Sequence, residues 1–309
     1  MHYKTNILTS TDGESICYYR WKANPNVPYK GLVQIAHGLG EHAGRYDHIA
    51  HLLQEEGYSV YANDHRAHGK TAEMKRLFGF YDGSDYFEDC VEDMHALSNL
   101  MKIEYPESKF ILFGHSMGSL LSRKYVTKYG NELDALILSG TASFIKGLGN
   151  IGLVTATTVT AFRGRARGNE FLKSFFFGEF NKKFKPNRTK LDWISSDEKQ
   201  VDLFEEDPYR VEDFSLGVFL DIIKNSKTLN KPEAFKSTPK DLPILMFSGD
   251  KDPVGEMGKG VKRVAKQYEK RGMDDFTFNL YEGGRHEMLN ETNAEAVEQE
   301  LLVWLKART

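Results

Sequence analysis

The chain has 309 residues, of which 40% are hydrophobic and 12% aromatic, and its formal net charge at pH 7 is −3. This length is enough for one large hydrophobic core, or for a core with a subdomain. The slight negative charge argues against nucleic acid as the main partner. The only cysteines are Cys17 and Cys90, which excludes a small disulfide scaffold and favours a reducing compartment.

Neither a signal peptide nor a membrane-spanning helix is expected from the sequence. Residues 1–6 are polar and do not form the apolar core of a signal peptide. The most apolar segment, 151–162, is too short to cross a bilayer and is rich in threonine. We therefore expect a cytoplasmic protein.

Short apolar segments alternate with helical patterns over the first half of the chain. A hairpin is predicted first, because two strand-like segments flank the turn signal Asp12-Gly13. Buried strands and amphipathic helices then follow one another, each recognised by its apolar spacing. The predicted strands are 3–9, 15–21, 31–36, 58–62, 110–113 and 135–139, and the predicted helices are 46–56, 86–103 and 117–129.

The alternation stops near residue 144 and resumes near residue 243, where strands 243–248 and 276–281 alternate with helices 256–271 and 292–305. Alternating strands and helices predict an α/β fold, a mostly parallel central sheet with helices on both faces. The interruption follows the carboxyl end of a strand, where such sheets bind ligands. We expect a core of residues 1–142 and 241–309 and an inserted, largely helical cap of residues 143–240.

The segment Phe110-Ile111-Leu112-Phe113-Gly114-His115-Ser116-Met117-Gly118 carries the clearest chemical signal. An apolar strand ends in Gly-x-Ser-x-Gly and a helical pattern follows at once, which is the context of a nucleophile elbow. Glycine at both positions avoids collisions with the neighbouring strand and helix. Ser116 is therefore predicted to be a nucleophile at the carboxyl edge of the sheet, next to the amino terminus of a helix.

A serine hydroxyl needs a base to take its proton, and that base needs an orienting carboxylate. His286 follows the last predicted strand, so its loop can reach Ser116. Asp250 and Asp252 both follow strand 243–248, and Asp252 is the better candidate because it lies further out, before a proline. The order Ser116, Asp252, His286 is the chain order of the α/β-hydrolase triad.

The transition-state oxyanion needs two backbone N–H donors. Met117 follows the nucleophile and is expected to provide one of them. Leu39, in the glycine-containing loop after strand 31–36, is expected to provide the other, because glycines let this backbone approach a substrate closely.

A metal site is the competing interpretation of Asp64, His65 and His68, which cluster in one loop. No further His or Cys at ligand spacing joins them, so we expect these side chains to fix the loop by hydrogen bonds. The predicted chemistry requires neither a metal nor a cofactor.

Several of these segments resemble the monoacylglycerol lipase and lysophospholipase branch of the α/β-hydrolase superfamily. The resemblance covers nearly the whole chain. Its one departure is Ala67, where the family usually has glycine in a structural loop. The matching segments are His37-Gly38-Leu39-Gly40-Glu41-His42-Ala43-Gly44-Arg45-Tyr46, Asp64-His65-Arg66-Ala67-His68-Gly69, Gly114-His115-Ser116-Met117-Gly118, Gly249-Asp250-Lys251-Asp252, the His286 loop, Leu191-Asp192-Trp193 and Glu206-Asp207-Pro208.

The resemblance implies an α/β-hydrolase fold and a serine hydrolase with Ser116, Asp252 and His286 as the triad and Leu39 and Met117 as oxyanion donors. The implied substrate is a small acyl ester, of monoacylglycerol or lysophospholipid type. A carboxylesterase for short-chain or aryl esters is the alternative within enzymes. Aminopeptidases share the fold, but a basic cap argues against peptides. A non-catalytic ligand-binding relative is the alternative from another class.

The inserted cap combines apolar and basic segments. Residues 151–162 and 171–180 could line an acyl channel or touch a lipid surface, or they could pack on the main core. Nine Lys and Arg residues lie between Arg163 and Lys190, against Glu170 and Glu179. This excess of positive charge would attract anionic lipid headgroups, or it would simply form a solvent-exposed face of the cap. The oligomeric state stays open.

Overall fold

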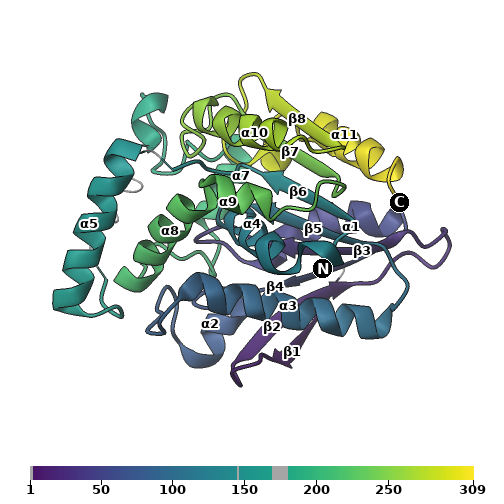
Figure 1. Cartoon of the computed structure of the whole chain (residues 1–309), viewed down its shortest axis with the longest axis horizontal. Coiled ribbons are helices and arrows are strands. Elements are labelled where there is room, and N and C mark those ends of the chain that lie inside the picture. The colour runs from purple at the N-terminus through teal and green to yellow at the C-terminus, as the bar shows by residue number, and fades with distance from the viewer. Residues whose placement is uncertain (1–2, 145, 169–179) are drawn as a thin grey trace.

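The computed structural model describes residues 3–144, 146–168 and 180–309 (Figure 1). In this part of the chain eight strands form one sheet in the order β1-β2-β4-β3-β5-β6-β7-β8. The β1–β2 and β2–β4 pairs are antiparallel, and all other neighbours are parallel. The strands are β1 Lys4–Thr9, β2 Ser15–Trp21, β3 Gly31–Ala36, β4 Tyr58–Asn63, β5 Phe110–His115, β6 Ala135–Ser139, β7 Ile244–Gly249 and β8 Phe276–Tyr281.

Helices cover both faces of this sheet, as the sequence pattern predicts. The α-helices are α1 Asp47–Glu55, α2 Gly69–Lys75, α3 Tyr86–Glu104, α4 Met117–Tyr129, α5 Lys146–Arg163, α7 Glu198–Glu205, α8 Leu216–Leu229, α9 Pro232–Lys236, α10 Lys259–Arg271 and α11 Ala294–Lys306. The short 3-10 helices are η1 Ala43–Tyr46, η2 Gly130–Glu132, η3 Phe180–Phe184 and η4 Met288–Asn290.

The central strands β3, β4, β5, β6 and β7 are buried at every position, and most of their residues are apolar because both faces of the sheet are covered. In β5, Phe110 and Leu112 pack into the core shared with α3, α4 and α10. Ile111 and Phe113 point the other way, into the core shared with α1 and α11. This alternation fixes the register of β5 and therefore the direction in which the chain leaves it.

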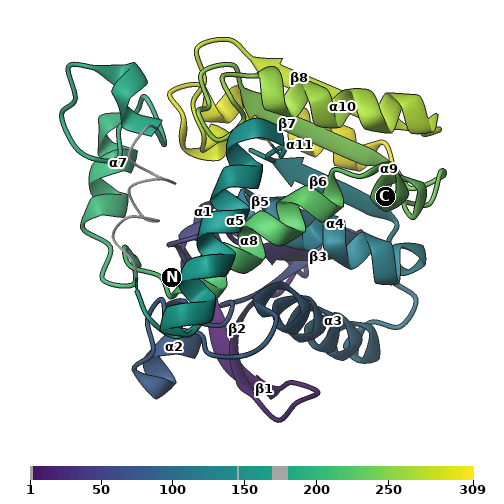
Figure 2. The same ribbon diagram turned by 60° about the vertical axis from the view of Figure 1, so that its left-hand side comes forward.

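The segment between β6 and β7 leaves the sheet and lies over its carboxyl edge. Helix α5 packs against α8, and α8 packs against α3 and α4; α5 and α8 lie side by side in both views (Figures 1 and 2). A separate small cluster of Trp193, Ile194, Val201 and Phe204 forms around α7. We propose that residues 143–240 form a cap over the core of residues 1–142 and 241–309. Of the aromatic segment 171–180, residues 171–179 lie outside the described part of the chain.

Three details differ from the sequence-based expectation. Helix α2 and the 3-10 turn η1 were not predicted, since each is short and has little apolar periodicity. Helix α10 begins at Lys259 rather than at 256, because Glu256, Met257 and Gly258 have positive φ values of 54°, 54° and 79°. No helix in the described ranges has the length and apolarity needed to cross a membrane.

Candidate active site

Ser116 lies at the sharp turn between β5 and α4. Its φ of 53° and ψ of −117° are strained values for a residue with a side chain. A Cβ atom at Gly118 would lie 1.9 Å from the Ala36 carbonyl oxygen, and one at Gly114 would lie 2.4 Å from the Gly118 carbonyl oxygen. Both glycines are therefore needed for the close contact between the turn and its neighbours, as the motif predicts.

The structure brings Ser116, His286 and Asp252 together from three separate loops. His286 Nε2 lies 2.8 Å from Ser116 Oγ, and His286 Nδ1 lies 3.0 Å from Asp252 Oδ2. Asp252 is held in place because its Oδ1 accepts a hydrogen bond of 2.8 Å from Val254 N. This is the geometry in which a base takes a proton from a hydroxyl while a carboxylate orients the imidazole.

Asp250, the other carboxylate considered from the sequence, does not reach His286. Its Oδ1 accepts a hydrogen bond of 2.9 Å from Gly283 N, and its Oδ2 lies 3.5 Å from Lys251 Nζ. Asp250 therefore braces the loop that carries the histidine rather than the imidazole itself.

The electrostatic surroundings of His286 favour its use as a base. Burial would lower the pKa of His286, but the charge of Asp252 and its hydrogen bond to the ring outweigh burial, so the pKa lies above its ordinary value. Burial lowers the pKa of the neighbouring His115 to about 4, which keeps that ring neutral. The His115 and His286 ring centroids lie 4.8 Å apart. Only one of the two adjacent imidazoles is thus suited to take up a proton near neutral pH.

The loop after β3 presents its backbone toward the same place. Gly38 N donates to Glu41 Oε1 at 2.5 Å, and Gly40 N donates to His68 Nε2 at 3.1 Å. Leu39, between them, and Met117, at the first position of α4, both line the cavity that contains Ser116. Within the described ranges no acceptor is found for the N–H of Leu39 or of Met117. Two such donors are the chemistry of an oxyanion hole.

The polar loop that raised the metal alternative is held by hydrogen bonds. Asp64 accepts bonds from Ala43 N at 2.8 Å and Lys70 N at 2.7 Å. His65 N donates to His37 Nε2 at 2.9 Å. Among the residues that the structure describes, no group of three or more His, Cys, Asp or Glu side chains could hold a metal ion. Asp64 and the histidines shape the loop that carries Leu39.

Ser116 opens into a cavity of about 1600 Å³. Its apolar walls come from two places. One wall is formed by α4, α5 and α8, and the other by the cap segment that precedes α7. The lining includes Leu120, Phe144, Gly149, Gly152, Ile222 and Ile223 on the first wall and Phe180, Leu191, Trp193 and Ile194 on the second. The cavity is large enough for a chain-like ligand, and most of its lining is apolar.

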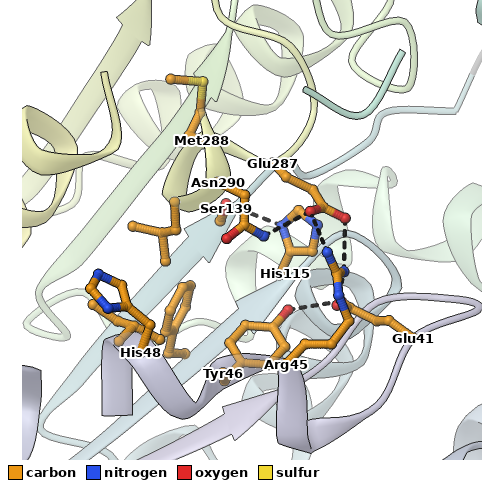
Figure 3. A pocket seen from close by; sticks show the side chains of 12 residues that line it. Glu41, Arg45, Tyr46, His48, His115, Ser139, Glu287, Met288 and Asn290 are labelled. Carbon is orange, nitrogen blue, oxygen red and sulfur yellow. Dashed lines mark hydrogen bonds and ion pairs between the residues drawn. The ribbon is translucent and has the colours of Figure 1, made fainter. Parts of the chain in front are cut away.

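Several functional neighbours were not identified as such from the sequence. Trp193 covers His286, with ring centroids 5.3 Å apart. Arg45 forms a polar network with Glu41 and with Glu287, the residue that follows His286 (Figure 3). Glu41 and Arg45 stand in a segment that the resemblance includes, and Glu287 follows His286 directly. The spacing of these residues along the sequence does not predict that their side chains meet.

Comparison with known proteins agrees with this architecture. The family model described as serine aminopeptidase, S33, matches residues 27–293. A monoacylglycerol lipase of Mycolicibacterium smegmatis is 28% identical over 95% of this chain and 93% of its own length. A monoglyceride lipase of Rattus norvegicus is 26% identical over 97% of this chain and 90% of its own length.

A solved structure of an esterase has the same fold as this chain. The crystal structure of a thermostable carboxyl esterase from Bacillus coagulans superimposes with a TM-score of 0.92 and 27% identity, covering 100% of this chain and 99% of that one. The non-catalytic alternative therefore loses its support. The chain belongs to the S33 family of α/β-hydrolases, in its monoglyceride-lipase-like branch, and is a carboxylic ester hydrolase.

Proposed function

We propose that this enzyme hydrolyses carboxylic esters of acyl chains, of monoacylglycerol or lysophospholipid type, with Ser116 as nucleophile, His286 as base and Asp252 as orienting acid. The observation that supports this most is the 2.8 Å contact between His286 Nε2 and Ser116 Oγ at the wall of a large, mostly apolar cavity. Leu39 N–H and Met117 N–H are proposed as the oxyanion donors.

The proposed reaction proceeds in two halves. Ser116 Oγ attacks the ester carbonyl carbon while its proton moves to His286 Nε2, and the carbonyl electrons move onto the oxygen. The two N–H groups stabilise that oxyanion, and losing one such donor typically costs about 3 kcal/mol. When the tetrahedral intermediate collapses, His286 gives its proton to the leaving alcohol. Water then repeats the sequence on the acyl-enzyme, which releases the acid and restores Ser116.

The shape of the cavity supports an acyl chain as the group bound beside the nucleophile. Leu120, Phe144 and Ile223 form an apolar wall on which such a chain can pack. This packing requires no hydrogen bond to the chain. The monoacylglycerol lipase of Mycolicibacterium smegmatis, similar over 95% of this chain, supports the same substrate class.

We also propose that α5 touches the lipid surface from which such a substrate comes. Its outer side exposes Ile151, Val154 and Phe162, whose exposed fractions are 62%, 67% and 87%. No charged residue occurs between Lys146 and Arg163. Gly152 of the same helix lines the cavity on its inner side. An uncharged outer face next to a substrate channel is suited to shallow contact with a bilayer.

A carboxylesterase for shorter esters is the second candidate. The carboxyl esterase from Bacillus coagulans, with a TM-score of 0.92, favours it. The peptide substrates that the family name suggests have less support, because Glu212 and Glu256 at the cavity are ion-paired with Arg210 and Arg263. A cytoplasmic location stays a proposal, supported by two buried cysteines that form no disulfide.

A fluorophosphonate probe followed by peptide mass spectrometry tests the nucleophile. We expect covalent labelling of Ser116 in the native protein and none in Ser116→Ala. An acyl-length series of glycerol and p-nitrophenyl esters then tests the substrate class, with kcat/KM expected to rise beyond four carbons. Failure to label Ser116 would refute the mechanism, and a sharp fall above four carbons would favour the carboxylesterase.

A further inference from the structure

Arg45, whose side chain is 11% exposed, joins two loops of the candidate active site (Figure 3). Its guanidinium binds Glu287 with both nitrogens, at 2.9 Å and 2.8 Å, and binds Glu41 Oε2 at 2.7 Å. Glu41 and Glu287 are only 4% and 6% exposed. A bidentate pair of this kind fixes position and angle together, which a single hydrogen bond does not.

Each carboxylate is bonded in turn to a part of the catalytic machinery. Glu41 Oε1 accepts a hydrogen bond of 2.5 Å from Gly38 N, directly before the proposed donor Leu39. Glu287 follows the proposed base, His286, and its Oε2 accepts a bond of 2.8 Å from Asn290 Nδ2. Arg45 thus links the loop of an oxyanion donor to the loop of the base, although these loops are far apart in the sequence.

The cap closes this network from above. The ring of Phe204, in α7, lies 4.2 Å from the Arg45 guanidinium carbon. Glu287 N donates to Ile194 O at 2.8 Å, which adds a backbone bond between the cap and the base loop. Because these three side chains are only 5% to 11% exposed, each ionic contact is stronger than it would be on an exposed surface.

The network also carries one more carboxylate than cation. Burial would raise the pKa of Glu287, but the charge and hydrogen bonds of Arg45 lower it to about 2, so this carboxylate is ionised near neutral pH. Counted by formal charge, Glu41, Glu287 and Arg45 together carry one excess negative charge, and both carboxylates act on His286 through their charge. The titratable and charged groups that face His286 from the elements around it are Asp252, Glu287, Glu41, Arg45 and His115.

We propose that Glu41, Arg45 and Glu287 act as a positioning clamp: they hold the oxyanion loop and the base loop in register, and their excess negative charge stabilises the imidazolium that His286 forms during the reaction. This inference rests on the proposed function. None of the three residues touches the reacting atoms, so each acts through Leu39 or His286.

Glu287→Gln tests the charge of the clamp, because it keeps the size of the side chain and removes its charge. The imidazole of His286 is titrated by NMR, its signal being identified from its loss in His286→Asn. We expect the pKa of His286 to fall by about half a unit or more in Glu287→Gln. The acid limb of kcat/KM should move to lower pH by the same amount, since a base with a lower pKa is deprotonated at lower pH.

Glu298→Gln is the matched control, because Glu298 is also buried, at 5% exposure, but pairs with His48 on α1. It should leave both the titration and the pH profile unchanged. An unchanged pKa of His286 in Glu287→Gln, or an equal shift in Glu298→Gln, would overturn the proposal.

Arg45→Lys tests the positioning, because it keeps the charge and loses the two-pronged contact. We expect kcat to fall about tenfold or more while KM changes less than about threefold, since the substrate still binds but the loops lose register. A kcat of Arg45→Lys equal to that of the wild-type enzyme would overturn the proposed clamp. If the wild-type chain neither hydrolyses esters nor reacts with fluorophosphonate, the proposed function fails instead, and the imidazole titration still decides whether the clamp acts on His286.

Discussion

The two sides of the cap are attached to the core in different ways. We call residues 180–206 the histidine side, because they cover the loop of His286 as well as forming one wall of the cavity, and α5 with α8 the channel side, because they contribute to the opposite wall. The histidine side is bonded through directional polar contacts, whereas the channel side is held mainly by apolar packing. This difference suggests that one side belongs to the catalytic site and the other sets which substrates fit.

Polar bonds on the histidine side run directly to the base loop. Arg285 donates to Ser195 O at 2.9 Å, Ser195 Oγ donates to Asn290 O at 2.7 Å and Ser196 N donates to Glu291 Oε1 at 2.9 Å. Because hydrogen bonds fix both distance and angle, this side cannot shift without moving the loop of His286.

The channel side is joined to the core by polar bonds near the end of α5 and at the end of α8, where Arg123 donates to Leu229 O at 2.6 Å. Arg165 forms an ion pair with Asp221 and donates to Gly83 O at 2.7 Å. Along the helix, Ala156 is buried with the apolar residues of α8 while Val154 faces outward. Apolar packing is not directional, so this side tolerates changes in side-chain size better than the histidine side does.

The largest expected effect belongs to Asp252, the carboxylate that lies beside His286. Asp252→Asn should lower kcat by about 10⁴-fold, because the amide no longer holds the imidazole tautomer that accepts the Ser116 proton. Asp250→Asn is the control and should cost far less, since Asp250 braces the loop through Gly283 N. Steady-state kinetics on a soluble ester measures both. The reverse ranking would move the acid role to Asp250.

A smaller and selective effect is expected from the channel side. Gly152→Leu places a side chain in the cavity and also favours the helix, so folding should be retained. We expect kcat/KM for long acyl chains to fall about 10- to 100-fold, with short chains nearly unaffected. Thr158→Leu, on the exposed side of the same helix, is the control. An equal loss for all chain lengths would mean that Gly152 does not line the acyl channel.

The smallest effect concerns the outer face of α5. Phe162→Asp adds a charge at a position that is 87% exposed, so stability should change little. We expect a fewfold lower rate on substrate in phospholipid vesicles and an unchanged rate on a soluble ester. Co-sedimentation with the vesicles measures binding directly. Wild-type binding and rate in both assays would remove the proposed lipid contact.

Much of the fold could be predicted from local patterns. The apolar segment from Phe110 to Phe113 predicted β5, and Gly114 with Gly118 predicted the turn around Ser116. Both followed from short-range constraints, namely burial on two faces and the space available for a Cβ atom. The order of Ser116, Asp252 and His286 predicted candidates that the structure then placed within reach of one another.

Other features depend on long-range contacts that no local pattern encodes. Arg45 and Glu287 are 242 residues apart, and an arginine in a loop is ordinarily a surface residue. The place of Trp193 over His286 depends on how the cap returns to the core. Helix α10 begins later than predicted because Glu256 and Met257 have positive φ values. Residues with a side chain rarely adopt such values, and sequence patterns do not predict them.

The different roles of the two sides of the cap are tested most directly by one ratio, kcat/KM for a long-chain ester divided by kcat/KM for a short-chain ester. It is measured in Ser195→Ala, from the histidine side, and in Gly152→Leu, from the channel side. Ser195 does not line the cavity, and its hydroxyl donates to Asn290 O in the loop that follows His286. We predict that Ser195→Ala lowers both rates about tenfold and leaves the ratio unchanged, because this bond positions the loop of the base. Gly152→Leu should lower the ratio itself. A ratio that changes in Ser195→Ala and stays constant in Gly152→Leu would contradict this account.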